Sequence, residues 1–407
     1  MSDDGRGASL VSYYQGLQFN PVLIRVEDSA VWEAHFANRR NLYERHLGIP
    51  LAYLRGAAVI EFGPNSGESA LLPALFGARL TLVEPNTQVL PRLRELFVRF
   101  GVDAQIERIH SVGIEDFDET RSFDLAIAEG FLHTLPSRNA MLCKVASLVR
   151  PGCFGVISYN DRCGGLLEYL RRVYLFRACE LSGVADPQSD ACLQLARDLF
   201  ASDFARLGLT RSFDAWWRDT LVNPFCRSEQ TWSLPELLPL LADVGCEFHS
   251  SSPAWFTGDR YRWYKRTPGV AERTAAVLEG WKGCLAYFLT GLNLEGRPTP
   301  PPDERVISDV RALVQGLSDF RVDPKRASLD VVYPTSLERY FGASEDARLR
   351  DLNREWMSLF ATLGTDSLAA LQDAYASAEA TRGLWGTAYH YLCFQRSLVA
   401  ASGPKSA

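Results

Sequence analysis

The sequence lacks several features that would identify its class at once. Its 43 Lys and Arg do not outnumber its 49 Asp and Glu, so the basic excess that is typical of nucleic-acid-binding proteins is missing. No apolar run reaches the roughly 18 residues that a membrane-spanning helix needs. The polar start, MSDDGRGASL, lacks the order of a signal peptide. We therefore expect a protein that neither binds nucleic acid nor spans a membrane.

The cysteine pattern is also uninformative about metals. The nine cysteines are spread along the chain and never form a Cys-x-x-Cys pair, which argues against structural zinc and a dithiol redox motif. Scattered cysteines among apolar residues are typical of reduced thiols, so we expect a cytoplasmic protein without a bound metal. The 407 residues suffice for one large domain or two joined domains.

Strand and helix signals alternate after residue 55. Such alternation with short connections predicts an α/β fold with a doubly wound, mostly parallel, Rossmann-like sheet. Two later strand signals bring the expected number of strands to seven. The strand signals lie at 57–62, 78–85, 104–112, the start of 123–135, 153–161, 246–252 and 385–396.

The segments around the late strands are long and mainly helical. We predict that they form a large helical cap, inserted after strands five and six. The expected parts are an N-terminal helical lid at 1–55, the sheet core at 56–161, a helical insertion at 162–245, a core strand at 246–254, a second helical insertion at 255–383, and the terminal strand and tail at 384–407.

A glycine-containing turn, VIEFGPNSG at 59–67, joins the first strand to the first helix. Gly63 and Gly67 permit a tight turn and let the backbone approach a ligand. Glu84 ends the second strand, where a carboxylate can accept hydrogen bonds from both hydroxyls of a ribose. A nicotinamide enzyme is the nearest alternative, but Asn65 takes the second glycine position of its Gly-x-Gly-x-x-Gly motif.

Residues 57–160 resemble the class I S-adenosylmethionine-dependent methyltransferases. VIEFGPNSG, with Glu61 as its acidic residue, is similar to their motif I, LTLVEP to motif II, and FDLAIAEGFLHTL to motif IV. The resemblance implies S-adenosylmethionine as the cofactor, with Gly63 and Glu129 near its methionine part. It also implies that Ile114 and Glu115 flank the adenine.

Two further cofactor contacts are expected from the N-terminal region. Arg39 or Arg40 could pair with the carboxylate of the cofactor, and we predict Arg40. Tyr14, in the pair Tyr13-Tyr14, could form part of a lid. The alternative for the two arginines is an exposed helix face.

Transfer to a hydroxyl requires a base that removes its proton. Asp161 after the fifth strand and His133 after the fourth are the candidates. Their alternatives are a turn or helix-capping residue for Asp161 and a structural histidine for His133. Aromatic platforms for the acceptor could come from Trp216-Trp217 and from residues 259–265.

The leading hypothesis is O-methylation of a small or medium polar acceptor, such as a sugar or a natural-product hydroxyl. N-methylation of a small molecule and an inactive scaffold with a cofactor fold are the alternatives. The intact set of Glu61, Gly63, Gly67 and Glu84 argues against a scaffold, which would not need it. Whether the protein forms a homodimer is left open.

Overall fold

The computed structural model describes residues 10–17, 24–207, 211–254, 268–294, 301–322 and 332–398. The chain divides into two units. The sheet unit comprises Met1–Tyr159, Leu234–Val277 and His390–Ala407. The helical unit comprises Asn160–Ser233 and Leu278–Tyr389.

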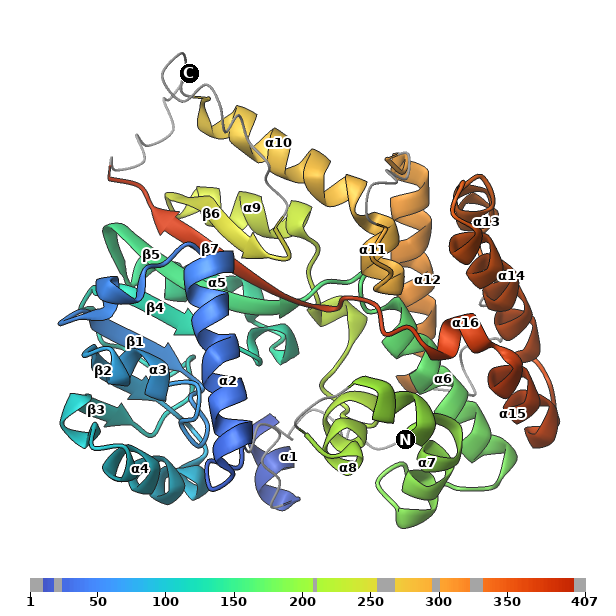
Figure 1. Cartoon of the computed structure of the whole chain (residues 1–407), viewed down its shortest axis with the longest axis horizontal. Helices are drawn as coiled ribbons and strands as arrows, with labels where there is room; N and C mark the ends of the chain where they lie inside the picture. The colour runs from blue at the N-terminus through green and yellow to red at the C-terminus, as the bar shows by residue number, and fades with distance from the viewer. Residues whose placement is uncertain are drawn as a thin grey trace. The chain divides into compact units, whose positions relative to one another are not determined.

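The sheet has seven strands in the order β3-β2-β1-β4-β5-β7-β6 (Figure 1). Neighbours from β3 to β5 are parallel, whereas β6 and β7 are antiparallel. The predicted seven-stranded, mostly parallel, Rossmann-like fold is therefore confirmed. The strands are β1 (Ala58–Phe62), β2 (Arg79–Val83), β3 (Ile106–His110), β4 (Phe123–Ala128), β5 (Val149–Asn160), β6 (Cys246–Ser252) and β7 (Tyr389–Arg396).

Helices of the sheet unit begin upstream of the first strand. The Asp28 side chain caps α2 by accepting from the N–H groups of Ala30 and Val31. On α2, the ring of Trp32 lies 4.8 Å from that of Phe100. The N-terminal region is thus part of this core. The helices are α1 (Leu10–Gly16), α2 (Ser29–Asn41), η1 (Leu42–His46), η2 (Leu51–Leu54), α3 (Leu71–Leu75), η3 (Thr87–Val89), α4 (Leu90–Arg99), η4 (Asp103–Gln105), η5 (Leu132–Thr134), α5 (Arg138–Ser147) and α9 (Leu234–Asp243).

The helical unit is organised around α6, most of whose side chains are buried. This helix packs against α7, α12 and α15. Its described helices are α6 (Leu166–Leu181), α7 (Asp190–Phe204), η6 (Ala205–Leu207), α8 (Phe213–Trp216), η7 (Trp217–Leu221), η8 (Ser228–Gln230), α11 (Leu285–Thr290), α12 (Glu304–Val322), α13 (Thr335–Gly342), α14 (Ala347–Thr362), α15 (Leu368–Ser377) and α16 (Glu379–Arg382), while α10 (Val270–Gly283) runs from one unit into the other.

The unit boundaries differ from the insertions expected at 162–245 and 255–383. Residues 234–245 belong to the sheet unit because α9 packs its apolar residues against β6 and α5. Residues 268–277 also belong to that unit. A helical pattern in the sequence does not reveal which neighbour receives the apolar face, and so it cannot set this boundary.

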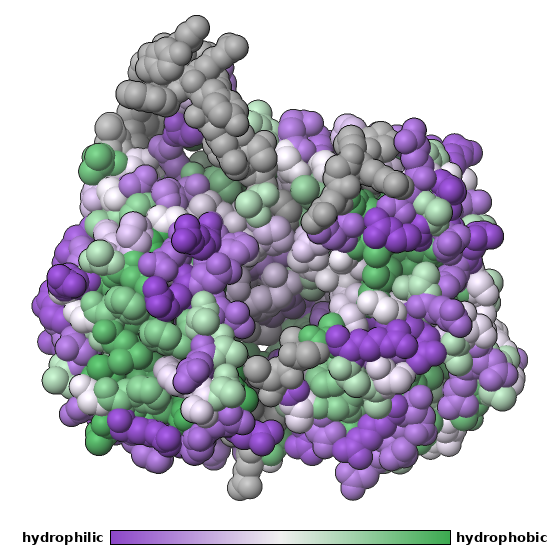
Figure 2. Space-filling view, viewed as in Figure 1, coloured by the Kyte–Doolittle hydropathy of each residue, from purple (hydrophilic) through white to green (hydrophobic). Residues whose placement is uncertain are grey.

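The visible face of the surface carries both polar and apolar residues, which are interspersed (Figure 2). Large exposed hydrophobic side chains come from separate elements, as with Leu75 on α3, Val98 on α4 and Met357 on α14. Among the described helices, none combines the length and hydropathy of a membrane-spanning segment.

Candidate functional site

Three neighbouring strands end in register at one edge of the sheet. Phe62, the last residue of β1, pairs with Val83 of β2 and with Ala128 of β4. The next residues along the chain are Gly63, Glu84 and Glu129, three of the predicted cofactor contacts. Because open α/β sheets bind ligands beyond the carboxyl ends of their strands, the topology places these three residues at the expected binding edge.

The turn after β1 requires unusual backbone geometry. Gly63 and Gly67 have φ angles of 68° and 91°, and Asn65 between them has φ 53°. Asn65 is the one non-glycine residue with positive φ in the described part of the chain, and asparagine tolerates this conformation better than most residues. A Cβ atom at Gly63 would lie 3.0 Å from the Phe131 ring, so a side chain there would crowd the turn.

Glu84 ties this turn to the end of β2. Its Oε2 accepts a hydrogen bond from the Asn65 N–H and its Oε1 accepts one from the Asn86 N–H, both at 2.8 Å. Burial raises the pKa of the Glu84 carboxyl, and the two backbone hydrogen bonds oppose that shift. Each oxygen keeps a second lone pair, so the carboxylate is held in place and can still accept from a ribose diol.

Helix α1 lies next to the same loop. The Gln15 side chain donates to Asn86 Oδ1 at 3.2 Å, two residues beyond Glu84. Tyr14 precedes Gln15 on this helix, and its ring lies 5.6 Å from that of Tyr13. The predicted lid residue is therefore on a segment that touches the β2 loop.

The loop after β3 carries the two predicted adenine contacts. Ile114 is buried, whereas the Glu115 side chain is exposed. Lys144 on α5 donates to the carbonyl oxygens of Ile114 and Glu115 at 2.7 and 2.9 Å. These bonds fix the loop backbone to α5.

The two adjacent arginines of α2 lie in different environments. Arg39 is 7% exposed and donates twice to the Glu129 carboxylate, at 2.7 and 2.9 Å. Tyr391 of β7 lies 3.4 Å from both partners. Arg40 faces solvent and pairs with Glu44 on its own helical segment. Of the two arginines considered for the cofactor carboxylate, Arg39 therefore lies in the candidate site. Arg40, the predicted one, lies outside it.

Glu61 and Tyr43 complete a buried polar cluster with Arg39 and Glu129. Burial, reinforced by the nearby negative charge of Glu129, raises the pKa of the Glu61 carboxyl to about 8. Glu61 Oε2 and the Tyr43 hydroxyl are buried and have no hydrogen-bond partner among the described residues. Buried polar atoms of this kind are normally satisfied by water, an ion or a ligand.

Sequence reasoning missed Tyr43, Arg39 as the preferred arginine, and Tyr391. A signal for the first two was present, because Trp32, Phe36, Arg39 and Tyr43 recur at helical spacing and face the same side. No sequence signal indicates Tyr391, because β7 reaches β5 only in the folded sheet.

The two candidate bases have different surroundings. His133 is buried in η5, the short helix that follows β4. Asp161 is fully buried in the helical unit, where its carboxylate accepts from the Gly164 N–H at 3.0 Å and the Trp281 indole N–H at 3.3 Å. Burial raises the Asp161 pKa to about 6. The hydrogen bond from Gly164 is the contact expected if Asp161 stabilises a turn and does not act as a base.

The predicted acceptor platforms are only partly described. Trp216 and Trp217 are each 1% exposed, and Trp216 packs edge-on against Trp385 at 5.3 Å. Residues 259–265 lie outside the described residues. Among the described side chains, no three His, Cys, Asp or Glu residues gather as metal ligands.

Comparison with known proteins identifies the segment that carries this site. The model of the family described as "Methyltransferase domain" matches residues 60–157. These residues form a methyltransferase domain. Class I methyltransferases, which the sequence resembles, use S-adenosylmethionine. Three features of the site fit that cofactor: the fixed carboxylate of Glu84, the close backbone turn at Gly63, and the buried Glu61 oxygen without a hydrogen-bond partner among the described residues.

Solved structures with a similar fold include several methyltransferases, each at low identity. CcbJ methyltransferase from Streptomyces caelestis is 18% identical over 30% of this chain and 56% of its own, with a TM-score of 0.26. N-methyltransferase NodS from Bradyrhizobium japonicum is 17% identical over 37% of this chain and 74% of its own, with a TM-score of 0.29. PKMT2 from Rickettsia typhi is 12% identical over 89% of this chain and 52% of its own, with a TM-score of 0.41.

The matches cover limited parts of both partners. The chain spans about half the length of several of these structures, for example 45% of a putative methyltransferase from Thermoplasma acidophilum. No curated protein matches the sequence.

Proposed function

We propose that this protein transfers a methyl group from S-adenosylmethionine to an oxygen atom of a small or medium polar acceptor, such as a sugar or natural-product hydroxyl. The observation that carries the proposal is the Glu84 carboxylate at the end of β2. It accepts one hydrogen bond from an N–H group of the loop after β1 and one from an N–H group of the loop after β2. An inactive scaffold would not need a buried carboxylate fixed at that edge. The cofactor, when bound, supplies an activated methyl group.

The residues of the sheet unit would divide the binding work. Glu84 accepts from the ribose hydroxyls, and the loop of Ile114 and Glu115 borders the adenine. Arg39 and Glu129 present opposite charges to the carboxylate and ammonium ends of the amino-acid part. Tyr14 would cover the adenosine side. We further propose that the protein acts in the cytoplasm, where its nine free thiols suit a reducing compartment.

The proton of the acceptor hydroxyl would pass to His133 or Asp161. Both side chains follow strands at the carboxyl edge, β4 and β5 respectively. The hydrogen bonds that Asp161 receives from Gly164 and Trp281 favour its charged form but also occupy it, so we favour His133. N-methylation remains the alternative, because a neutral amine acceptor needs no base before transfer.

Calorimetric titration with S-adenosylhomocysteine tests cofactor binding. We expect wild-type protein to bind and Glu84→Ala to bind at least about tenfold more weakly, because hydrogen bonds to a carboxylate are lost. Glu95→Ala, on the exposed face of α4, is the matched control and should bind as wild type. Absence of heat with the wild-type protein would rule out the proposed function.

Isotope transfer tests the acceptor atom. The protein is incubated with methyl-labelled S-adenosylmethionine and a small-molecule extract, and the labelled product is analysed by NMR, since oxygen- and nitrogen-bound methyl groups differ in chemical shift. With that product as the assay, His133→Ala should lower turnover at least about tenfold without changing cofactor affinity. If neither His133→Ala nor Asp161→Asn slows transfer, the base assignment is wrong.

A further inference from the structure

Helix α6 carries buried arginines that are satisfied in different ways. Arg177 donates to Glu180 at 2.6 Å and to Asp366 at 3.2 Å, so it has carboxylate partners. Arg171, six residues earlier and 1% exposed, has no carboxylate partner among the described residues. A buried cation without a direct counter-ion is costly, so its surroundings require an explanation.

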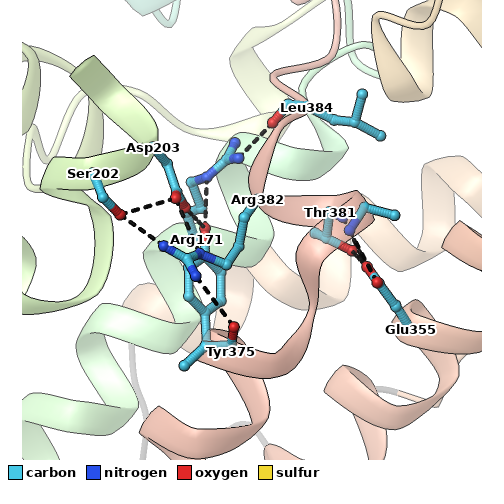
Figure 3. A network of polar contacts seen from close by, with 10 residues as sticks. Arg171, Ser202, Asp203, Glu355, Tyr375, Thr381, Arg382 and Leu384 are labelled. Atoms are coloured by element: carbon cyan, nitrogen blue, oxygen red, sulfur yellow. Dashed lines mark hydrogen bonds and ion pairs between the residues drawn. The ribbon is translucent and has the colours of Figure 1, made fainter. Parts of the chain in front are cut away.

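The hydrogen-bonded chain that includes Arg171 joins two guanidinium groups to one carboxylate; the nearby Glu355 carboxylate accepts instead from Ala380 and Thr381. Its Nε donates to the Tyr375 hydroxyl at 3.1 Å, and that hydroxyl donates to Asp203 at 3.0 Å (Figure 3). Arg382 also donates to Asp203, at 3.0 Å. Another nitrogen of Arg171 donates to the Leu384 carbonyl. In this described network, one carboxylate therefore serves two guanidinium groups.

Two buried donors next to each other have no acceptor within the described part of the chain. Arg171 Nη1 and the Trp385 indole nitrogen are both buried without a hydrogen-bond partner among the described residues. The guanidinium carbon lies 4.0 Å from the centre of the Trp385 ring, so the two groups are stacked. The Trp385 side chain as a whole is only partly buried. Unused donors beside two guanidinium groups that share one carboxylate are the features expected of an anion-binding site.

We propose that Arg171 and Trp385 bind the carboxylate of a small molecule, one donor for each oxygen. The aromatic rings of Trp385 and Trp216, packed edge-on, give the site an apolar wall that suits a ligand with a ring next to its carboxylate. This inference goes beyond the proposed function. The binding site itself does not require catalysis.

Matched probes test the site directly. Phenylacetate and phenylacetamide have the same shape but differ in charge, and their binding is measured by ligand-observed NMR and calorimetry over a millimolar range. We expect phenylacetate to bind at least about tenfold more tightly, because only the carboxylate offsets the Arg171 charge. Equal binding of the two probes, or no binding of phenylacetate, overturns the proposal.

Substitutions test whether phenylacetate binds at Arg171 and Trp385. Arg171→Met should weaken phenylacetate binding at least about tenfold, whereas Arg197→Met, which removes an exposed arginine of α7, should leave it unchanged. Trp385→Phe keeps an aromatic ring at this position and removes the indole N–H, so it provides the test if Arg171→Met does not fold. Unchanged phenylacetate binding in a folded Arg171→Met or Trp385→Phe protein overturns the proposal.

The same proteins separate this inference from the proposed function. Binding of S-adenosylhomocysteine should be the same in wild type and Trp385→Phe. If the cofactor fails to bind while phenylacetate binds with the expected selectivity, the proposed function is wrong and the carboxylate site stands. If the cofactor binds and phenylacetate does not, the proposed function stands and this inference is wrong.

Discussion

Arg39 and Arg40 show that two adjacent residues of a helix can lie in very different surroundings. Both carry the same charge, but Arg39 is buried against Glu129 and Arg40 faces solvent beside Glu44. A helix turns about 100° per residue, so adjacent side chains meet different surroundings. The consequences of removing the two charges should differ accordingly.

We expect Arg39→Met to lower the free energy of unfolding by about 3 kcal/mol, because it leaves the Glu129 carboxylate partly buried without its partner. Arg40→Met should change it by less than about 0.5 kcal/mol, since its pair is exposed. Denaturant unfolding of both variants measures the difference. Equal effects would show that the Arg39 pair does not stabilise the fold.

Glu61 predicts a pH dependence. With its pKa raised from 4.5 to about 8, the folded protein retains a proton that the unfolded chain releases. The stabilisation by this residue is therefore present below pH 4.5 and is lost as pH rises toward 8.

Glu61→Gln cannot ionise and should escape this loss. Relative to wild type, its free energy of unfolding should increase between pH 5 and 8 by up to a few kcal/mol, at about 1.4 kcal/mol per pKa unit. Denaturant unfolding across this pH range measures the change. Glu95→Gln on the exposed face of α4 serves as the control. Parallel pH curves for Glu61→Gln and wild type would contradict the raised pKa.

At the scale of elements, close approach of strands depends on single glycines. A Cβ atom at Gly155 of β5 would lie 2.1 Å from the Phe394 ring of β7. In contrast, no atom approaches within 4 Å of the corresponding position at Gly283, near the end of α10. The first glycine is thus required by packing, and the second is not.

We expect Gly155→Ala to destabilise the protein by about 2 kcal/mol or more, because the Phe394 ring must move. Gly283→Ala should be neutral or stabilise by up to about 1 kcal/mol, because alanine favours helix. Thermal unfolding of the two variants provides the comparison. A Gly155→Ala protein as stable as wild type would mean that β7 does not press against β5 at this point.

At the scale of the whole molecule, each unit carries its own polar cluster. The predicted cofactor contacts on β1, β2 and β4 all belong to the sheet unit. The network of Arg171, Asp203 and Tyr375 belongs to the helical unit. Ligand binding stabilises the structure that holds the ligand, by about 2.7 kcal/mol at one hundred times Kd.

S-adenosylhomocysteine should therefore protect the two units unequally from hydrogen exchange. We expect added protection to concentrate at residues 59–67 and 80–86, with little change in α13 to α15. Mass spectrometry of peptides with and without the ligand measures this. Protection spread evenly over α13 to α15 would contradict a cofactor site confined to the sheet unit.

The sequence by itself determined the sheet and the core of the cofactor motif. Alternating apolar strands and helices, the Gly63 and Gly67 turn and the acidic end of the second strand are local patterns, and local backbone chemistry carries them. They sufficed to predict seven strands and the methyltransferase domain.

Tertiary structure decided the rest, because it depends on which distant side chains meet. Helical spacing could have favoured Arg39 over Arg40, but its partner Glu129 is known only from the folded chain, and so are the contacts of Asp161 with Gly164 and Trp281. The polar network at Arg171 likewise depends on residues more than 200 positions away, such as Tyr375. Such pairing between distant side chains has no period along the chain, so no sequence pattern reports it.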